Sequence, residues 1–194
     1  MRPERMTEWY HAILESQMAK GGIYIDATMG NGHDTLFLCE MAGENGKVLA
    51  FDIQKLAIEN TRKRLKKQGV EKRAQLILDS HVNMTQYQAE DTVDGICFNF
   101  GYLPGGDHSL ATKADTSVEA IEAALSLLKK GGILCMCIYS GKDTGYEEKE
   151  AILNYLKELD DKKYIVIVNQ YYNKKNSPPI PVFVYKRESE TAEV

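Results

Sequence analysis

The chain has 194 residues, of which 43% are hydrophobic. This suffices for one α/β domain spanning residues 1–194, without room for a second full domain. The formal net charge of −4 gives no general attraction to nucleic acid, so such a partner would have to meet a local basic patch. Residues 1–20 mix charged and apolar side chains at helical spacing. They predict an N-terminal helix, exclude a signal peptide or membrane anchor, and favour a cytoplasmic protein. Residues 187–194 are polar and acidic, as in a frayed tail.

Strand-like apolar runs alternate with helical patterns along most of the chain. The runs lie at 23–25, 48–51, 74–78, 93–98 and 133–139, and the helical patterns at 35–41, 56–68, 116–128 and 146–159. A strand followed by a helix, repeated in this way, predicts a parallel sheet with right-handed crossovers. A Gly131-Gly132 turn precedes the fifth run.

The last two strand-like runs break this pattern. Residues 164–171 and 182–186 are joined by a loop at 173–179 that is too short for a crossover helix, so they predict an antiparallel hairpin. The expected fold is α/β and Rossmann-like: a seven-stranded, mostly parallel sheet with a C-terminal antiparallel hairpin and helices on both faces. Such a sheet resembles that of class I methyltransferases.

Three groups of residues that could suggest chemistry are interpreted as structural. The four cysteines occur singly or in Cys135-Met136-Cys137, without a Cys-x-x-Cys pair, and predict buried thiols. The basic run at 62–67 predicts the solvated face of an amphipathic helix. Tyrosines and lysines at 171–175 could stack on and grip RNA, but hairpin packing and solubility explain them equally well.

The segment 25–35 runs from a strand through a glycine-rich turn into a helix, where a nucleotide cofactor belongs. Glycines allow close approach of the backbone to a ligand, and the helix start offers free amide groups. The candidate binding residues in the turn are Thr28, Gly30, Asn31 and Gly32.

Three carboxylates follow successive strands and narrow the choice of cofactor. Asp26 would repel a pyrophosphate but can bind the ammonium group of a methionine moiety. Asp52 lies about 20 residues beyond the glycines, where a carboxylate accepts both ribose hydroxyls. Asp79 can meet the adenine edge. The set favours S-adenosylmethionine (SAM) over a nicotinamide cofactor. Proteins that bind nicotinamide cofactors have a Gly-x-Gly-x-x-Gly turn, and this chain has Thr35 at the position of the third glycine.

The loop after the fourth strand, residues 99–107, supplies a side-chain amide and a phenol next to the expected methyl group. Its start is similar to the Asn/Asp-Pro-Pro-Tyr/Phe motif of methyltransferases that act on amino groups, with Phe100-Gly101 in place of the prolines. Asn99 and the backbone at Phe100 would orient an amine. The predicted catalytic residues are Asn99, Phe100, Tyr102 and Asp107.

Taken together, several segments resemble a bacterial family labelled rRNA methylases, which is related to the tRNA 5-(aminomethyl)-2-thiouridine methyltransferases. The segments are 26–35, 51–54, 80–81, 99–107, 112–113 with 116, 139–141 and 176–179, within residues 22–186. The resemblance implies a class I SAM-dependent methyltransferase with acceptor contacts from residues 99–102. It implies cofactor contacts from Asp26, Asn31, Asp34, Thr35, Asp52, Gln54, Ser80 and His81. Asn99, which is expected beside the methyl group, is predicted to contact the cofactor as well.

The chain departs from the family in one place. Gly141-Lys142-Asp143-Thr144-Gly145 replaces an expected Gly-His-x-Gly-Gly, and Lys142 could contact a phosphate instead. The four histidines lack ligand spacing, and no metal is expected. Of these, His33 and His81 are expected to face the site, whereas His11 and His108 are expected to be solvated or capping residues.

The predicted reaction is methyl transfer from SAM to a neutral amine, releasing S-adenosylhomocysteine (SAH). The proton would go to Asp107, His81 or Tyr102, which the sequence leaves open. The expected substrate is the aminomethyl group of a 5-aminomethyl-(2-thio)uridine at the tRNA wobble position. The alternatives are rRNA, a protein amine or a small molecule, and, more distantly, a non-catalytic SAM- or RNA-binding protein. Because no RNA-binding module is appended, the enzyme would use its own surface or a homodimer to hold RNA.

Overall fold

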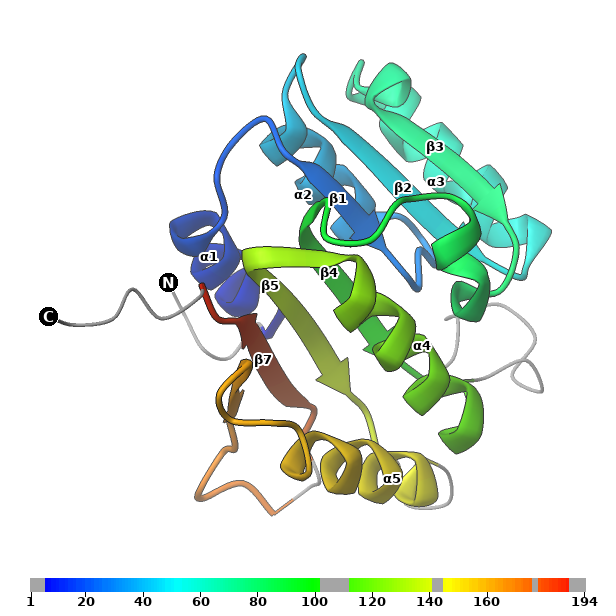
Figure 1. Ribbon diagram of the computed structural model, residues 1–194. Coiled ribbons are helices and arrows are strands. Elements are labelled where there is room, and N and C mark those ends of the chain that lie inside the picture. Colours follow the sequence, from blue (N-terminus) through cyan, green and yellow to red (C-terminus); the bar gives the residue numbers. More distant parts are fainter. Residues whose placement is uncertain (1–5, 102–111, 141–144, 176–177, 189–194) are drawn as a thin grey trace, which may run out of the picture.

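The computed structural model describes residues 6–101, 112–140, 145–175 and 178–188. Their centre is a seven-stranded sheet with the strand order β3-β2-β1-β4-β5-β7-β6 (Figure 1). The strands are β1 (Ile23–Asp26), β2 (Lys47–Asp52), β3 (Ala74–Leu78), β4 (Val93–Phe100), β5 (Leu128–Ile138), β6 (Tyr164–Val168) and β7 (Ile180–Lys186). β1 to β5 are parallel, and β7 runs antiparallel to both β5 and β6. The predicted fold, including the terminal hairpin, is confirmed.

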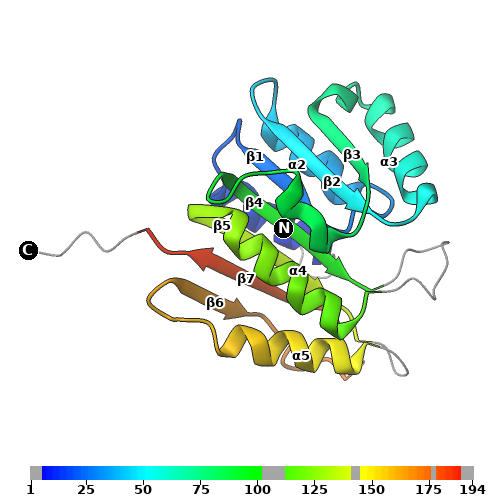
Figure 2. The same cartoon turned by 45° about the vertical axis from the view of Figure 1, so that its right-hand side comes forward.

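Helices cover both faces of the sheet (Figures 1 and 2). They are α1 (Met6–Gln17), α2 (His33–Ala42), α3 (Lys55–Lys67), α4 (Ala114–Leu127) and α5 (Tyr146–Lys157), with short 3-10 turns η1 (Glu71–Arg73) and η2 (His81–Gln86). Leu14 of α1, Leu38 of α2 and Leu65 of α3 belong to the apolar cluster on one face. Ile121 of α4 and Ile152 of α5 belong to the cluster on the other. Among the described helices, none has both the length and the apolar character needed to cross a membrane.

Two of the differences from the predicted element boundaries have a local cause. β5 begins at Leu128 because its pairing with β4 shifts from Val93–Leu128 to Gly95–Ile133, so the Gly131-Gly132 turn lies within an irregular strand start. β6 ends at Val168 rather than at 171. Its partner strand offers Pro181 at the next position, and a proline has no N–H to continue the ladder.

Local predictions about α3 and the cysteines are confirmed. α3 buries Ala57, Thr61 and Leu65 and exposes most of its basic side chains, as an amphipathic helix does. All four cysteines are free and buried.

The order of the strands determines where a ligand can bind. The chain moves outward from β1 through β2 to β3, then returns to the other side of β1 for β4 and β5. In open α/β sheets, the carboxyl ends of the strands on either side of such a switch point leave a crevice. The carboxyl ends of β1 and β4 meet at that point, which brings the cofactor turn and Asn99 together.

Candidate functional site

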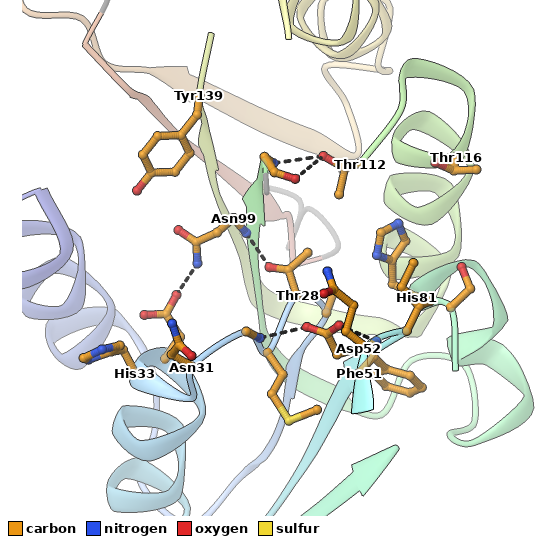
Figure 3. A pocket seen from close by; sticks show the side chains of 18 of the residues that line it. Thr28, Asn31, His33, Phe51, Asp52, His81, Asn99, Thr112, Thr116 and Tyr139 are labelled. Carbon is orange, nitrogen blue, oxygen red and sulfur yellow. Dashed lines mark hydrogen bonds between the residues drawn. The ribbon is translucent and has the colours of Figure 1, made fainter. Parts of the chain in front are cut away.

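A cavity of about 970 Å³ lies at the carboxyl ends of the parallel strands (Figure 3). Small-molecule sites usually have volumes of about 300–1,000 Å³. Many of the residues predicted from the sequence to bind the cofactor or acceptor line it: Thr28, Gly30, Asn31, Asp34, Asp52, Gln54, Asp79, Ser80, His81 and Asn99.

The cofactor turn is held by hydrogen bonds from the next strand. Gly30 and Gly32 have φ values of 52° and 75°, in the left-handed region that favours glycine. The Gly30 N–H donates to Asp52 Oδ2 at 3.0 Å. A Cβ on Gly32 would lie 2.6 Å from the Thr61 hydroxyl, so this glycine permits close packing of the turn on α3.

Asp52 combines a structural role with free acceptor capacity. Its second oxygen, Oδ1, accepts from the Gln54 N–H at 2.9 Å. Each carboxylate oxygen has a further lone pair, so both can accept another hydrogen bond from the cavity. Burial raises the pKa of Asp52, while the Gln54 and Gly30 amides act in the opposite direction. The pair of oxygens suits two vicinal hydroxyls.

Asp79 is fixed next to Asp52, at the end of β3. It accepts hydrogen bonds from the Asn83 amide at 2.9 Å, the Tyr87 hydroxyl at 2.8 Å and the Ser80 N–H at 2.7 Å. The hydrogen bond from Asn83, followed by that from Tyr87, lowers the pKa of Asp79. The carboxylate therefore stays ionised and fixed at the rim of the cavity.

Asp26, Gly32 and Thr35 lie behind the cavity wall rather than in it, unlike the arrangement predicted for them. Asp26 is fully buried and accepts from the Thr28 N–H at 3.2 Å and the Thr35 hydroxyl at 2.6 Å. In the structure its carboxylate supports the turn and has no exposed surface. Burial, followed by the charge of Asp34, raises the pKa of Asp26 to about 7.

On the acceptor side, Asn99 is the predicted residue whose side chain faces the cavity. Its backbone N–H donates to the Thr28 hydroxyl, and its Nδ2 donates to Asp34 Oδ2, both at 2.6 Å. The contact predicted at Phe100 was through its backbone. The Phe100 carbonyl accepts from the Tyr139 N–H at 3.3 Å, and the side chain is fully buried, with its ring stacked on Phe98 at a centroid distance of 4.9 Å. The predicted residues Tyr102 and Asp107, together with His108 and Lys142, lie outside the described residues.

His81 also lines the cavity. Its Nε2 is buried and has no hydrogen-bond partner among the described residues. Burial lowers the pKa of His81, with a hydrogen bond to the Ala27 backbone acting in the opposite direction. The His81 ring packs edge-to-face with Phe98, with the two ring centroids 5.9 Å apart. A neutral imidazole with an unused nitrogen therefore borders the cavity.

Sequence reasoning missed the contribution of α1. Tyr10 lines the cavity, and its hydroxyl donates to Asp34 at 2.6 Å. The expectation that His11 is solvated or caps a helix is wrong. Its Nε2 lies 2.8 Å from Asp34 Oδ1, and its ring stacks on Phe37 at 4.0 Å. No spacing rule connects residues 10 and 11 with residue 34, because a packed interface makes the contact.

The sequence analysis assigned no individual role to two further groups of residues at the cavity. Tyr139, Thr112 and Thr116 line it and fall in segments that carried the family resemblance. Arg64, in the basic run of α3, turns back to donate to the Asn31 carbonyl at 2.7 Å and contacts His33 at 2.9 Å. Burial, followed by the Arg64 charge, lowers the pKa of His33.

The lining suits a cationic nucleoside. Asp52 and Asp79 bring carboxylates to one cavity, and a ligand with a sulfonium and an ammonium group would complement them. A pyrophosphate would be opposed by the same charges. Among the described residues, no three His, Cys, Asp or Glu side chains gather as a metal site would require.

Known proteins are similar to this chain in sequence and in fold. The family described as "Putative rRNA methylase" matches residues 48–185. A "tRNA (mnm(5)s(2)U34)-methyltransferase, chloroplastic" from Arabidopsis thaliana is 36% identical over 195 residues, covering 96% of this chain and 71% of that protein. A structure described as a "putative rRNA-methylase" from Clostridium thermocellum has 44% identity and a TM-score of 0.89, covering 93% of this chain and 96% of the other. A "putative methyltransferase" from Streptococcus mutans, solved with SAH, has 40% identity and a TM-score of 0.84, with 96% and 98% coverage.

Fold, cavity and comparisons together define a class I SAM-dependent methyltransferase. Within that class, the chain belongs to the family described as "Putative rRNA methylase".

The raised pKa of Asp26 predicts a pH-dependent stability. A folded-state pKa above the unfolded value of about 3.9 stabilises the fold at low pH, and this contribution is lost as the pH rises towards about 7. Asp26→Asn removes the charge and lets the Thr35 hydroxyl accept instead of donate. As the pH rises from 5 to 7, the free energy of unfolding of the variant, measured with denaturant, should increase by about 2 kcal/mol relative to that of wild type. Asp161→Asn, at an exposed turn, controls for charge removal, and a difference that does not change with pH would contradict the assignment.

Proposed function

We propose that SAM binds in the cavity with its ribose on Asp52, its adenine near Asp79 and Ser80, and its methionine part at the turn formed by residues 28–31. The two free acceptor positions on Asp52 support the ribose assignment. The S. mutans structure, similar over almost its whole length, contains SAH, the product that SAM leaves after methyl transfer. This orientation directs the methyl group towards Asn99.

For the acceptor, we propose the aminomethyl nitrogen of a 5-aminomethyl-(2-thio)uridine at the tRNA wobble position. The observation that carries this proposal is the Asn99 amide. Its nitrogen is used by Asp34, so its oxygen is left as a hydrogen-bond acceptor for an N–H at the cavity. The A. thaliana relative is named for a methyltransferase of that nucleotide. With this substrate, the protein would act on tRNA in the cytoplasm.

The chemistry is a single in-line displacement. SAM supplies an electrophilic methyl group on a sulfonium. The lone pair of the neutral amine forms the new N–C bond as the S–C bond breaks, and the electrons of that bond stay on sulfur in SAH. Asn99 holds the amine roughly 3–3.5 Å from the methyl carbon, which is the main contribution that positioning can make.

The amine must lose a proton, because an alkyl ammonium, with a pKa of about 10.4, has no lone pair at neutral pH. Of the three candidates for this role, Asp107, His81 and Tyr102, only His81 belongs to the described residues. Its buried, unpartnered Nε2 and lowered pKa suit a general base that is neutral at pH 7. We propose that His81 accepts the proton, directly or through a water.

An rRNA base is the second candidate acceptor, and the description of the family favours it. The two acceptors differ in the nitrogen that reacts. An exocyclic amine on a base is already neutral and needs no proton removal before attack, whereas an aminomethyl group does. Dependence of the rate on His81 therefore favours the aminomethyl substrate.

The substrate proposal predicts labelling of a single nucleoside. With radiolabelled SAM and bulk tRNA from a strain lacking the terminal wobble methyl, nucleoside mass spectrometry should find the label in the methylated aminomethyl-uridine. Asn99→Ala should bind SAH normally but lose at least about 100-fold in turnover, because the amine is no longer positioned. Label in rRNA and none in tRNA would move the assignment to the second candidate.

Asp52→Ala should weaken SAH binding at least about 100-fold in calorimetry, since two hydrogen bonds to a charged acceptor are lost. Asp52→Asn keeps the side-chain shape and one oxygen, so its SAH affinity should lie between those of Asp52→Ala and wild type. This intermediate case separates lost ligand contacts from a collapsed turn. Wild-type affinity in both variants would remove Asp52 from the binding site.

The proton acceptor can be tested by the pH profile of kcat/KM. In wild type, the acidic limb should lie below pH 6.5, the ordinary histidine value, because the His81 pKa is lowered and activity requires the neutral ring. His81→Asn should lose this limb and about 100-fold or more in rate. His33→Asn, which alters the other histidine at the cavity, is the matched control. If both variants retain the wild-type limb, the proton goes elsewhere.

A further inference from the structure

The Asn99 amide is oriented by a group that is itself fixed from another part of the fold. Nδ2 of Asn99 donates to Asp34 Oδ2 at 2.6 Å. An ionised carboxylate can only accept hydrogen bonds, so it holds the NH₂ end of the amide and turns the oxygen away from itself. In Figure 3 a dashed line marks this hydrogen bond from the Asn99 amide nitrogen, and the amide oxygen lies on the side of Tyr139.

Asp34 must therefore remain a carboxylate, although it is only 5% exposed. Burial favours the neutral form, but hydrogen bonds from His11, Tyr10 and Asn99 outweigh it and lower the pKa of Asp34. The residue also lies in the first turn of α2, where the helix dipole favours a negative charge. Its ionised state depends on these donors being present together.

Two of the three donors come from α1. The Tyr10 hydroxyl reaches Asp34 at 2.6 Å, and burial, followed by the Asp34 charge, raises the Tyr10 pKa so that it stays a donor. His11 Nε2 lies 2.8 Å from Asp34 Oδ1, and its ring plane is fixed by stacking on Phe37 at an interplanar angle of 8°. α1 thereby supplies donors to both oxygens of the carboxylate, including the one that accepts from Asn99.

We propose that Asp34, held by Tyr10 and His11 of α1, is a positioning residue that keeps the oxygen of the Asn99 amide towards the incoming amine. It acts through Asn99 rather than on the substrate. Because the oxygen can only accept, the site selects a nucleophile that carries an N–H. This role differs from a cofactor contact, and it rests on the proposed N-methylation.

Steady-state kinetics on the aminomethyl-uridine tRNA, together with SAH calorimetry, test the proposal. Asp34→Ala frees the amide to rotate and should lower kcat about 100-fold, while the Kd for SAH changes less than about threefold. Asp34→Asn retains one oxygen that can accept from Asn99, so part of the rate should return. Tyr10→Phe removes one hydroxyl and should lower kcat about tenfold.

Tyr155→Phe, on α5 and away from the cavity, is the matched control and should behave as wild type. Wild-type kcat in both Asp34→Ala and Tyr10→Phe would overturn the proposal. So would an Asp34→Ala defect confined to SAH affinity, which would make Asp34 a cofactor contact. Normal SAH binding also serves as the check that each variant has folded.

A measurement without turnover separates this proposal from the substrate assignment. In NMR spectra of the wild-type protein, the Asn99 side-chain NH₂, assigned with Asn99→Asp, should exchange slowly with solvent and lose that protection in Asp34→Ala. If wild type methylates no tRNA but shows this protection, the substrate assignment fails and the positioning role stands. If Asn99 exchanges freely in an active wild-type enzyme, the positioning role fails and the substrate assignment stands.

Discussion

The buried carboxylate of Asp34 connects three parts of the chain that are far apart in sequence. It belongs to α2, receives donors from α1, and fixes a side chain at the end of β4. An isolated buried carboxylate is strongly unfavourable, and only paired or well-bonded charges are tolerated in such positions. Hydrogen bonds to charged groups contribute about 1.5–3 kcal/mol each. The acceptor side of the cavity is therefore in its final geometry only when α1 is packed against α2.

A second constraint is the concentration of negative charge around the same cavity. Asp26 and Asp34 influence each other, and the structure separates their behaviour: Asp34 is supplied with donors, whereas the buried Asp26 has a raised pKa. Such divergence is typical of neighbouring carboxyl groups in functional sites. The carboxylates of Asp52 and Asp79, which line the cavity, favour a cofactor bearing a sulfonium and an ammonium group over an anionic dinucleotide.

Much of the fold and the cofactor side could be predicted from the sequence, because both depend on local patterns. Strand and helix periodicity gave the parallel sheet, and the short 173–179 loop gave the hairpin. The glycine turn with Asp52 and Asp79 could be assigned because carboxyl ends of parallel strands must meet at one edge. The burial of three predicted site residues could not be predicted in this way. Asp26 and Thr35 bond to each other beneath the turn, and Phe100 packs on Phe98, so their burial was settled by side-chain packing that periodicity does not encode.

The role of α1 could not be found in this way at all. Residues 10 and 11 read as part of an amphipathic helix, and their polar atoms reach Asp34 only after that helix packs on the sheet. The family resemblance pointed to Asp34 but assigned it to the cofactor. The contacts of its carboxylate are what connect it with Asn99.

The most direct test of the central claim is a crystal structure of the enzyme with SAH and an anticodon stem-loop that carries 5-aminomethyl-2-thiouridine. The central claim predicts the ribose hydroxyls on Asp52, the flipped-out aminomethyl nitrogen within hydrogen-bond distance of Asn99 Oδ1, and the Asn99 NH₂ still on Asp34. An aminomethyl group bound away from Asn99, or SAH outside the cavity at the carboxyl ends of the strands, would contradict it.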